Sequence, residues 1–304
     1  ILTHLINGEV ILFSLNKIEL KKIDILGFGN NVQEASCMMK IDEEHILMFL
    51  GGLDNKLHVY YFTIKDINDQ KTNIFHYLAT LKGHENAITD LALVKLDEKS
   101  AFIASSSKDS YIRIWRFQKK PTENQSLKPN ALIIVNKNHY DFTINEEKYQ
   151  INLESILNLH TEPVSSVRWG KQNNSIGFIE SNLVLLSSSF DFSLLLWSKD
   201  EKSGVWVNKS RLGQMGGNKN AFFGAIFNDS FDKIMAYTYH GGTFFWHKKQ
   251  DDWVSIPCIS GHFSRVTDLD WNSSNDYLIS CSQDQSTRVF AKWEGGTNNW
   301  HEIS

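Results

Sequence analysis

The chain has 304 residues, which is long enough for one large domain or two of ordinary size, with a core that needs no disulfide or metal. Lysine and arginine (31) nearly balance aspartate and glutamate (35), so the net charge of −4 gives no reason to expect DNA or another nucleic acid as the main partner. Nine tryptophans, eighteen glycines and only four prolines, among many short β-branched and aromatic runs, favour an all-β chain.

Cysteine spacing and hydropathy argue against disulfide-rich, zinc-binding and membrane-spanning proteins. Cys37, Cys258 and Cys281 form no C-x-x-C pair, which excludes a disulfide framework or a zinc ribbon and is typical of a reducing compartment. The sequence has no run of 18 apolar residues that would predict a membrane span. Because the chain begins with Ile1 and not with methionine, we expect a trimmed piece of a longer protein, incomplete at the N-terminus.

Weak copies of a repeat occupy the first part of the chain. The first copy ends at Phe13, after Asn7-Gly8, and predicts a partial unit over residues 1–24. The second copy spans about 25–75 and begins at Gly27-Phe28. Its apolar positions and closing residues are Val32, Ala35, Cys37, Asp54 and Tyr60.

The clearest unit spans about 76–135 and opens with Gly83-His84. Apolar residues follow His84 at offsets of four, seven and nine, as expected for a strand with one buried face. A serine, an aspartate and a closing tryptophan complete the unit: Ile88, Leu91, Leu93, Ser105, Asp109 and Trp115.

An insertion follows this unit, over about 117–152. Its first part, up to residue 130, is polar and rich in turn formers, which predicts a loop. Alternating segments at 131–135 and 140–151 predict a hairpin or an added edge strand, with Asn136-Lys137-Asn138 as the turn. We expect the insertion to lie at the rim, where partners have access.

Three later units repeat the spacing. The fourth (about 150–208) and the sixth (about 256–304) carry the same polar and closing positions: His160, Ser187, Asp191, Trp197 and His262, Ser280, Asp284, Phe290. The fifth, about 209–255, closes on Trp246 but has Asn218 and His240 in place of the histidine and the aspartate. Since these substitutions remove the shared polar residues, we expect the fifth to be the least stable of the complete units.

The aromatic residues that close the units recur at intervals of 47, 55, 82, 49 and 44 residues. A period of about 40–45 residues, with Gly-His near the start and tryptophan near the end, resembles the WD40 family. The aspartate that usually follows the tryptophan is replaced by Arg116 and Ser198. The resemblance implies an all-β WD40 β-propeller: one propeller over 1–304, with about six recognisable blades of an expected seven.

The resemblance also implies that the histidine, serine, aspartate and tryptophan of a unit form one buried hydrogen-bonded chain. The same residue types occur in hydrolase triads, but their recurrence in register at His84, His160 and His262 favours a structural role. The glycine pairs form no phosphate-binding loop, and the histidines form no metal motif. We therefore expect no enzymatic activity, no catalytic or metal site and no cofactor.

Five segments that a generic repeat does not require resemble a family within the WD40 proteins, the second subunits of Elongator complexes. They are residues 200–207, 211–218, 261–271, 284–293 and 300–304. This resemblance implies a non-catalytic scaffold that holds the largest and the catalytic subunits together for wobble-uridine modification of transfer RNA. It implies protein partners, only indirect contact with transfer RNA and no DNA or membrane. It also implies a cytoplasmic location, with the nucleus as an additional one.

Two other functions stay open at this stage. One is a generic WD40 adaptor in another assembly, such as a ubiquitin-ligase receptor or a signalling complex. The other is a propeller enzyme, which would need acids or histidines away from the repeated positions. Basic residues near aromatic ones, such as Lys248-Lys249, suggest either RNA contact or solvated loops. Three tryptophans outside the repeat pattern are candidate partner contacts, or else pack an outer strand: Trp206, Trp253 and Trp300.

Overall fold

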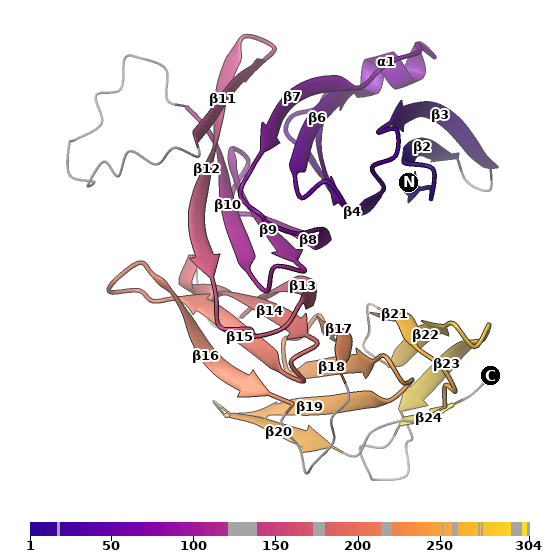
Figure 1. Cartoon of the computed structure of the whole chain (residues 1–304), viewed down its shortest axis with the longest axis vertical. Helices are drawn as coiled ribbons and strands as arrows, with labels where there is room; N and C mark the ends of the chain where they lie inside the picture. The colour runs from indigo at the N-terminus through magenta and orange to yellow at the C-terminus, as the bar shows by residue number, and fades with distance from the viewer. Residues whose placement is uncertain are drawn as a thin grey trace. The chain divides into compact units, whose positions relative to one another are not determined.

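The computed structural model shows an all-β chain with two compact units, Ile1–Asn158 and Leu159–Ser304 (Figure 1). Each unit contains three antiparallel sheets, which we number in chain order as blades 1 to 6. The structure describes residues 1–16, 19–120, 139–172, 180–213, 221–250, 252–256, 261–272, 274, 276–292 and 300–302. The all-β prediction is confirmed, and six sheets match the six predicted repeat units.

The first unit holds blades 1 to 3. Blade 1 has the strands β1 (Leu2–His4), β2 (Glu9–Asn16) and β3 (Glu19–Gly27). Blade 2 has β4 (Gln33–Lys40), β5 (His45–Gly52), β6 (Leu57–Thr63) and β7 (His76–Leu81), with the helix α1 (Ile64–Asn68) before β7. Blade 3 has β8 (Ile88–Lys95), β9 (Ser100–Ser107), β10 (Ile112–Lys119), β11 (His139–Ile144) and β12 (Glu147–Leu157).

The second unit holds blades 4 to 6. Blade 4 has β13 (Val164–Lys171), β14 (Leu183–Ser189), β15 (Leu194–Lys199) and β16 (Trp206–Leu212), with a short 3-10 helix at Glu180–Asn182. Blade 5 has β17 (Phe222–Phe227), β18 (Lys233–Thr238), β19 (Thr243–Lys249) and β20 (Asp252–Ile256). Blade 6 has β21 (Val266–Trp271), β22 (Tyr277–Ser282), β23 (Thr287–Lys292) and β24 (Trp300–Glu302).

Apolar residues on facing sides of neighbouring sheets form the cores within each unit. Blade 1 packs on blade 2 through a cluster that includes Val10, Leu12, Met48 and Leu50. In the second unit, Val184 and Leu196 of blade 4 meet Trp246 of blade 5. The second strands of blades 2 to 5 therefore have few exposed side chains, and β14, for example, is buried along its whole length. In blade 6, three residues of β22 are exposed: Tyr277, Ile279 and Cys281. Among the described residues, no helix is long and apolar enough to cross a membrane.

The sheets end later in the chain than the predicted unit boundaries. The strands β7, β12 and β16 belong to blades 2, 3 and 4, where they pair with β6, β10 and β15. The predicted boundaries at 75/76, about 150 and 208/209 would instead assign all or part of each of these strands to the next unit. The physical reason is that the Gly-His pair that opens a sequence unit lies after the last strand of a sheet, so the sequence repeat and the sheet are offset by about one strand.

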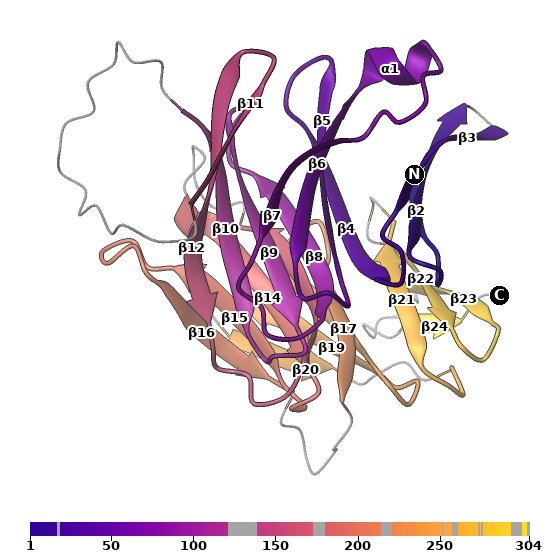
Figure 2. The same cartoon turned by 45° about the horizontal axis from the view of Figure 1, so that its top comes forward.

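The inserted hairpin also differs in place from the prediction. Its turn is at Asn145 and Glu146, which both have positive φ, between β11 and β12. Strand β12 pairs directly with β10, and β11 adds a fifth strand outside it (Figure 2). The segment Asn136-Lys137-Asn138 lies outside the described residues. The expected edge addition is therefore present, but with a different turn.

Candidate functional site

Blade 3 contains a chain of hydrogen bonds between the four residues that its repeat unit singled out. His84 Nδ1 lies 2.8 Å from Asp109 Oδ2, and His84 Nε2 lies 2.8 Å from Ser105 Oγ. Trp115 Nε1 donates to the same serine oxygen over 3.1 Å. The chain is satisfied when neutral His84 donates from Nδ1 to Asp109 and accepts at Nε2 from Ser105.

Blades 4 and 6 repeat this geometry. His160 lies 2.9 Å from Asp191 Oδ2 and 2.8 Å from Ser187 Oγ, and Trp197 Nε1 donates to that oxygen over 3.0 Å. In blade 6, His262 lies 3.0 Å from Asp284 Oδ2 and 2.6 Å from Ser280 Oγ. Phe290, which closes blade 6, has no N–H to donate. The structure thus brings together all eleven residues in three separate sets.

The aspartates of these sets also hold the turn between the second and third strands. Asp109 Oδ1 accepts from Tyr111 N over 2.9 Å, and Asp191 Oδ1 accepts from Ser193 N over 3.0 Å. The residue after each aspartate has positive φ, +70° at Ser110 and +65° at Phe192. Since this left-handed conformation is unfavourable for residues other than glycine, the carboxylate stabilises a turn that the local sequence does not favour.

Burial and hydrogen bonding shift the pKa values in these sets. Burial lowers the pKa of His84, and the nearby Arg113 charge adds to this, although the Asp109 carboxylate opposes it. Burial alone would raise the pKa of Asp109, but hydrogen bonds from His84 and from two backbone N–H groups outweigh it and hold the pKa at about 2. Similar bonds hold the pKa of Asp191 well below its usual range. At neutral pH each of these carboxylates is therefore an ionised hydrogen-bond acceptor.

Two members of the sets were missed by the sequence analysis. Arg113 is 8% exposed, and its Nη1 lies 3.3 Å from Asp109 Oδ2, so a second donor meets the carboxylate. Ser107 donates to the backbone oxygen of Asn86 over 2.9 Å and accepts from Asp109 N over 3.1 Å. The signal for the serine was present, because a serine stands two residues before the aspartate in three blades: Ser107, Ser189 and Ser282.

Blade 2 has a different arrangement. His58, on β6, lies 2.6 Å from Asp54 Oδ2, and its other ring nitrogen lies 3.1 Å from Thr80 Oγ1. The Phe28 ring stands at the position of His84 and packs on His58 with the ring centroids 5.1 Å apart. The aspartate is thus still paired with a histidine, but with one from its own hairpin.

The repeated serines offer no accessible nucleophile. Ser105, Ser187 and Ser280 are each 0% exposed, and each already bonds to a histidine. The arrangement can therefore satisfy buried polar groups, but a substrate cannot reach the serine oxygens. Among the residues that the structure describes, no group of three or more His, Cys, Asp or Glu could hold a metal ion.

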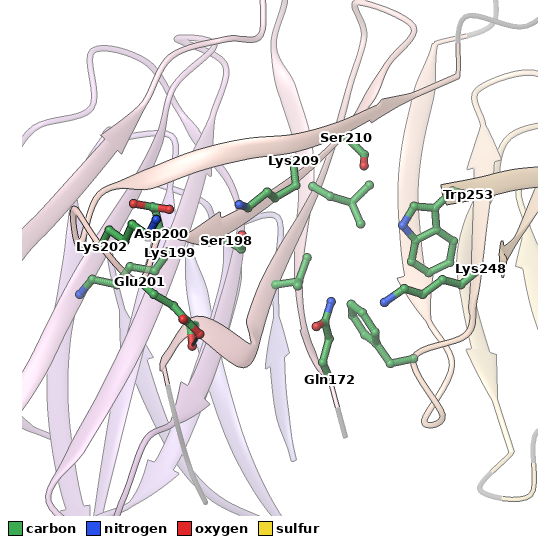
Figure 3. Close-up of a pocket in the computed structure, with 14 residues that line it drawn as sticks. Gln172, Ser198, Lys199, Asp200, Glu201, Lys202, Lys209, Ser210, Lys248 and Trp253 are labelled. Carbon is green, nitrogen blue, oxygen red and sulfur yellow. Dashed lines mark hydrogen bonds between the residues drawn. The ribbon is translucent and has the colours of Figure 1, made fainter. Parts of the chain in front are cut away.

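The three tryptophans proposed as partner contacts have different environments. Trp206 is buried at 6% exposure and packs edge to face on Trp169, with the ring centroids 5.6 Å apart. This environment agrees with the second of the two expectations for this residue, packing of an outer strand. Trp253 is only half-buried and lies beside a pocket (Figure 3). Trp300 begins β24, and its side chain lies outside the described part.

Lys119 and Lys120 are a further pair of basic residues that could contact RNA, and both form ion pairs. Lys119 lies 2.8 Å from Glu147, and Lys120 lies 2.6 Å from Asp141, both on the inserted hairpin. These two ion pairs neutralise the pair of lysines at the end of β10, so they favour the interpretation as a solvated loop.

Comparisons with known proteins agree with this geometry. The family described as "WD domain, G-beta repeat" matches residues 75–116 and 253–290. Elongator complex protein 2 of Rattus norvegicus is 31% identical over 98% of this chain and 36% of its own length. The proteins of the same name are 32% identical over 84% of the chain in Danio rerio, and 33% identical over 84% in Arabidopsis thaliana.

A solved structure supports the fold independently. The WD40 β-propeller domain of Doa1 superposes with a TM-score of 0.61 at 16% identity, covering 99% of this chain and 78% of that one. The prediction of a WD40 β-propeller is therefore confirmed, with six blades in the described residues. The chain spans about a third of the length of the curated relatives it matches, 30% to 36% in the three named above.

Proposed function

We propose that this chain belongs to a non-catalytic scaffold subunit of an Elongator complex. The chain carries WD40 repeats, and most of its 304 residues resemble part of Elongator complex protein 2. The observation that carries the proposal is the similarity to proteins of that name over 98% of the chain. The match extends well beyond the two segments that the general repeat family covers, 75–116 and 253–290.

The geometry of the blades supports a scaffold role. The polar residues that could do chemistry are buried in the blades and bonded to one another, as at Ser105 and His84. The loops and outer strands stay exposed, and the hydrogen-bonded strands of the blades hold them in place. A preorganised surface of this kind binds partners with a small entropic cost, because little of the chain has to be ordered on association.

The proposal also includes the partners and the reaction. In this proposal the subunit holds the largest and the catalytic Elongator subunits together while the catalytic subunit modifies the wobble uridine of transfer RNA. The chain itself contributes no cofactor, metal or reacting group, and its contact with transfer RNA is indirect. In this proposal the complex acts in the cytoplasm, with the nucleus as an additional location.

Affinity purification of the tagged natural protein tests the partners. We expect the largest and the catalytic Elongator subunits to be recovered in near-equal amounts. Recovery of ubiquitin-ligase or signalling components in their place would contradict the proposal and favour a generic adaptor.

Mass analysis of transfer RNA after depletion of the protein tests the reaction. We expect the carboxymethyl-type modifications of wobble uridines to be lost and to return when the natural protein is restored. Unchanged modification after complete depletion would contradict the proposal.

A further inference from the structure

The pocket beside Trp253 lies between blades 4 and 5, within the second unit (Figure 3). Its volume is about 580 Å³, which is enough for one or two large side chains of a bound polypeptide. Blade 4 contributes residues of β14, β15, β16 and the turn at residues 200–202, and blade 5 contributes Phe231, Lys248 and Trp253. The repeat pattern does not account for this cavity, because its polar lining residues lie outside the hydrogen-bonded sets.

The pocket has an apolar wall. Val184, Leu196 and Phe231 are at most 5% exposed and belong to the core between the two blades. Trp253 packs its ring against Phe231 at a centroid distance of 6.1 Å but keeps part of its surface accessible. A half-exposed tryptophan beside a cavity is typical of an anchor point for an apolar side chain of a partner.

Two lysines that line the pocket form no ion pair among the described residues. Lys248 extends over the Phe231 ring, with Nζ 5.0 Å from the ring centroid, and Lys209 reaches in from β16 (Figure 3). Neither makes an ion pair within 4.0 Å in the described part of the chain, whereas the neighbouring Lys199 lies 2.9 Å from Glu180. Lys248 can therefore pair with a carboxylate of a bound molecule beside Trp253, and Lys209 can do so toward the end of the pocket that holds Asp200.

The acidic residues of the pocket are held by local hydrogen bonds. Asp200 accepts from the backbone N–H of Ser203 over 2.9 Å and from its hydroxyl over 2.7 Å, and Ser181 donates to Glu201 over 3.0 Å. Figure 3 shows Asp200 and Glu201 at one end of the pocket and Trp253 and Lys248 at the other. Lys209 extends toward the Asp200 end, where the charges of the two residues attract each other, so Lys248 supplies the positive charge beside Trp253.

This combination favours a peptide over a nucleic acid. A phosphate backbone carries a charge at every nucleotide, so part of it would lie beside Asp200 and Glu201 and be repelled, whereas a peptide can place its acidic residues at the lysines alone. Binding of single-stranded RNA also needs several stacking side chains along a basic groove, whereas Trp253 is the one aromatic ring here with an accessible surface among the described lining residues. A polypeptide needs only one apolar anchor with charges placed beside it.

We propose that this pocket docks an extended segment of a partner protein in which a large apolar side chain is flanked by acidic residues. The apolar side chain fills the space beside Trp253, and the carboxylates pair with Lys209 and Lys248. This inference goes beyond the scaffold proposal and does not depend on it, because it holds for any partner that carries such a segment.

Fluorescence anisotropy with two matched peptide pools tests the inference. One pool contains fluorescein-labelled nonapeptides with a central leucine, phenylalanine or tryptophan between pairs of aspartates and glutamates, and the other has lysine in place of every acid. We expect the acidic pool to bind the chain at least tenfold more tightly than the basic pool. The double substitution Lys209→Glu and Lys248→Glu should remove that binding and reverse the preference toward the basic pool.

Three comparisons keep the test specific. Lys249→Glu, at the exposed neighbouring position of β19 outside the pocket, should leave binding unchanged, and Trp253→Ala should weaken it about tenfold with the lysines intact. Melting curves of each variant confirm that it is folded. Equal binding of the two pools, equal weakening by Lys249→Glu, or tighter binding of a nine-nucleotide oligouridine with the same dependence on Lys209 and Lys248 would each overturn the proposal.

Discussion

Blades 3 and 5 stabilise the same turn by different means. In blade 3 the turn after the second strand contains Asp109 followed by Ser110, a non-glycine residue with φ of +70° that the carboxylate supports. In blade 5 the exposed His240 stands at the aspartate position, and Gly241 follows with φ of +84°. Glycine needs no carboxylate to hold this conformation, so the turn survives the loss of the aspartate.

The interiors of the two blades differ in the same way. Ala236 occupies in blade 5 the register of Ser105, so the hydroxyl that joins histidine to tryptophan in blade 3 is missing. Trp246 packs instead against Phe222 and Phe244, with ring centroids 6.1 and 6.3 Å apart. The comparison indicates that a blade can be stabilised by a polar network or by aromatic packing with a glycine turn.

The largest effect is expected from removing the aromatic centre of blade 5. Trp246 is 2% exposed, and Trp246→Ala should lower the free energy of unfolding by about 3–5 kcal/mol, because the cavity it leaves has no polar network beside it. Denaturant unfolding monitored by circular dichroism measures this. A loss below about 1 kcal/mol would show that aromatic packing does not stabilise blade 5.

Removing the carboxylate of blade 3 should have the next largest effect. Asp109→Ala should cost ~2 kcal/mol or more, because it leaves His84 and Arg113 buried without their acceptor. The matched change in blade 5, His240→Ala, should stay within about 0.5 kcal/mol because that side chain is exposed. Equal melting midpoints for Asp109→Ala and the unmodified chain would contradict the proposed network.

The turn glycine of blade 5 provides a third test. Gly241→Ala should cost roughly 1–2 kcal/mol, since alanine is unfavourable at positive φ. Its Cβ would also lie 2.7 Å from the carbonyl oxygens of His262 and Ser264. Ser110→Ala in blade 3 should be nearly neutral, because that turn already holds a residue with a Cβ. Similar losses for both variants in urea unfolding would contradict the contrast between the turns.

The smallest expected effect is a dependence of stability on pH that comes from blade 3. The pKa of His84 is lower in the folded chain than in the unfolded one, so its contribution is complete above about pH 6.5 and is lost as the pH falls below that value. Asp109, with its pKa lowered to about 2, adds a contribution that is present above about pH 4 and lost as the pH falls toward 2.

Melting midpoints between pH 7.5 and 5 should fall for the unmodified chain and fall less for His84→Gln. The reason is that glutamine carries no group that titrates in this range. Parallel curves for the two proteins would show that His84 does not contribute to the pH dependence.

The repeat could be predicted because its residues face constraints that recur in each blade. A histidine, a serine and an aspartate at fixed offsets indicate one buried chain of bonds, and the structure brings them together at His84, His160 and His262. Arg113 escaped notice because its position is occupied by Leu195 in blade 4 and by Arg288 in blade 6, so the residue type does not recur regularly.

The register of blade 2 could not be predicted from the Gly27-Phe28 pair. In blade 3, Ser105 pairs with Leu91 of the first strand. In blade 2, Leu50 takes the place of Ser105 and pairs with Ser36, whereas the sequence spacing aligns Ala35 with Leu91. The loop after Phe28 is one residue longer than the loop after His84, and a shift of one residue moves each side chain to the other face of a strand. The pocket beside Trp253 was equally out of reach, because it depends on how two separate blades pack.

The central claim is that the histidine, serine and aspartate sets hold their blades together from inside. Amide hydrogen exchange of the double variant Asp109→Ala and Asp191→Ala, compared with the unmodified chain, tests it most directly. We predict faster exchange in β9, β10, β14 and β15, with little change in β18 and β19 of blade 5. Unchanged protection in β9, β10, β14 and β15, or an equal loss in all of these strands, would contradict the claim.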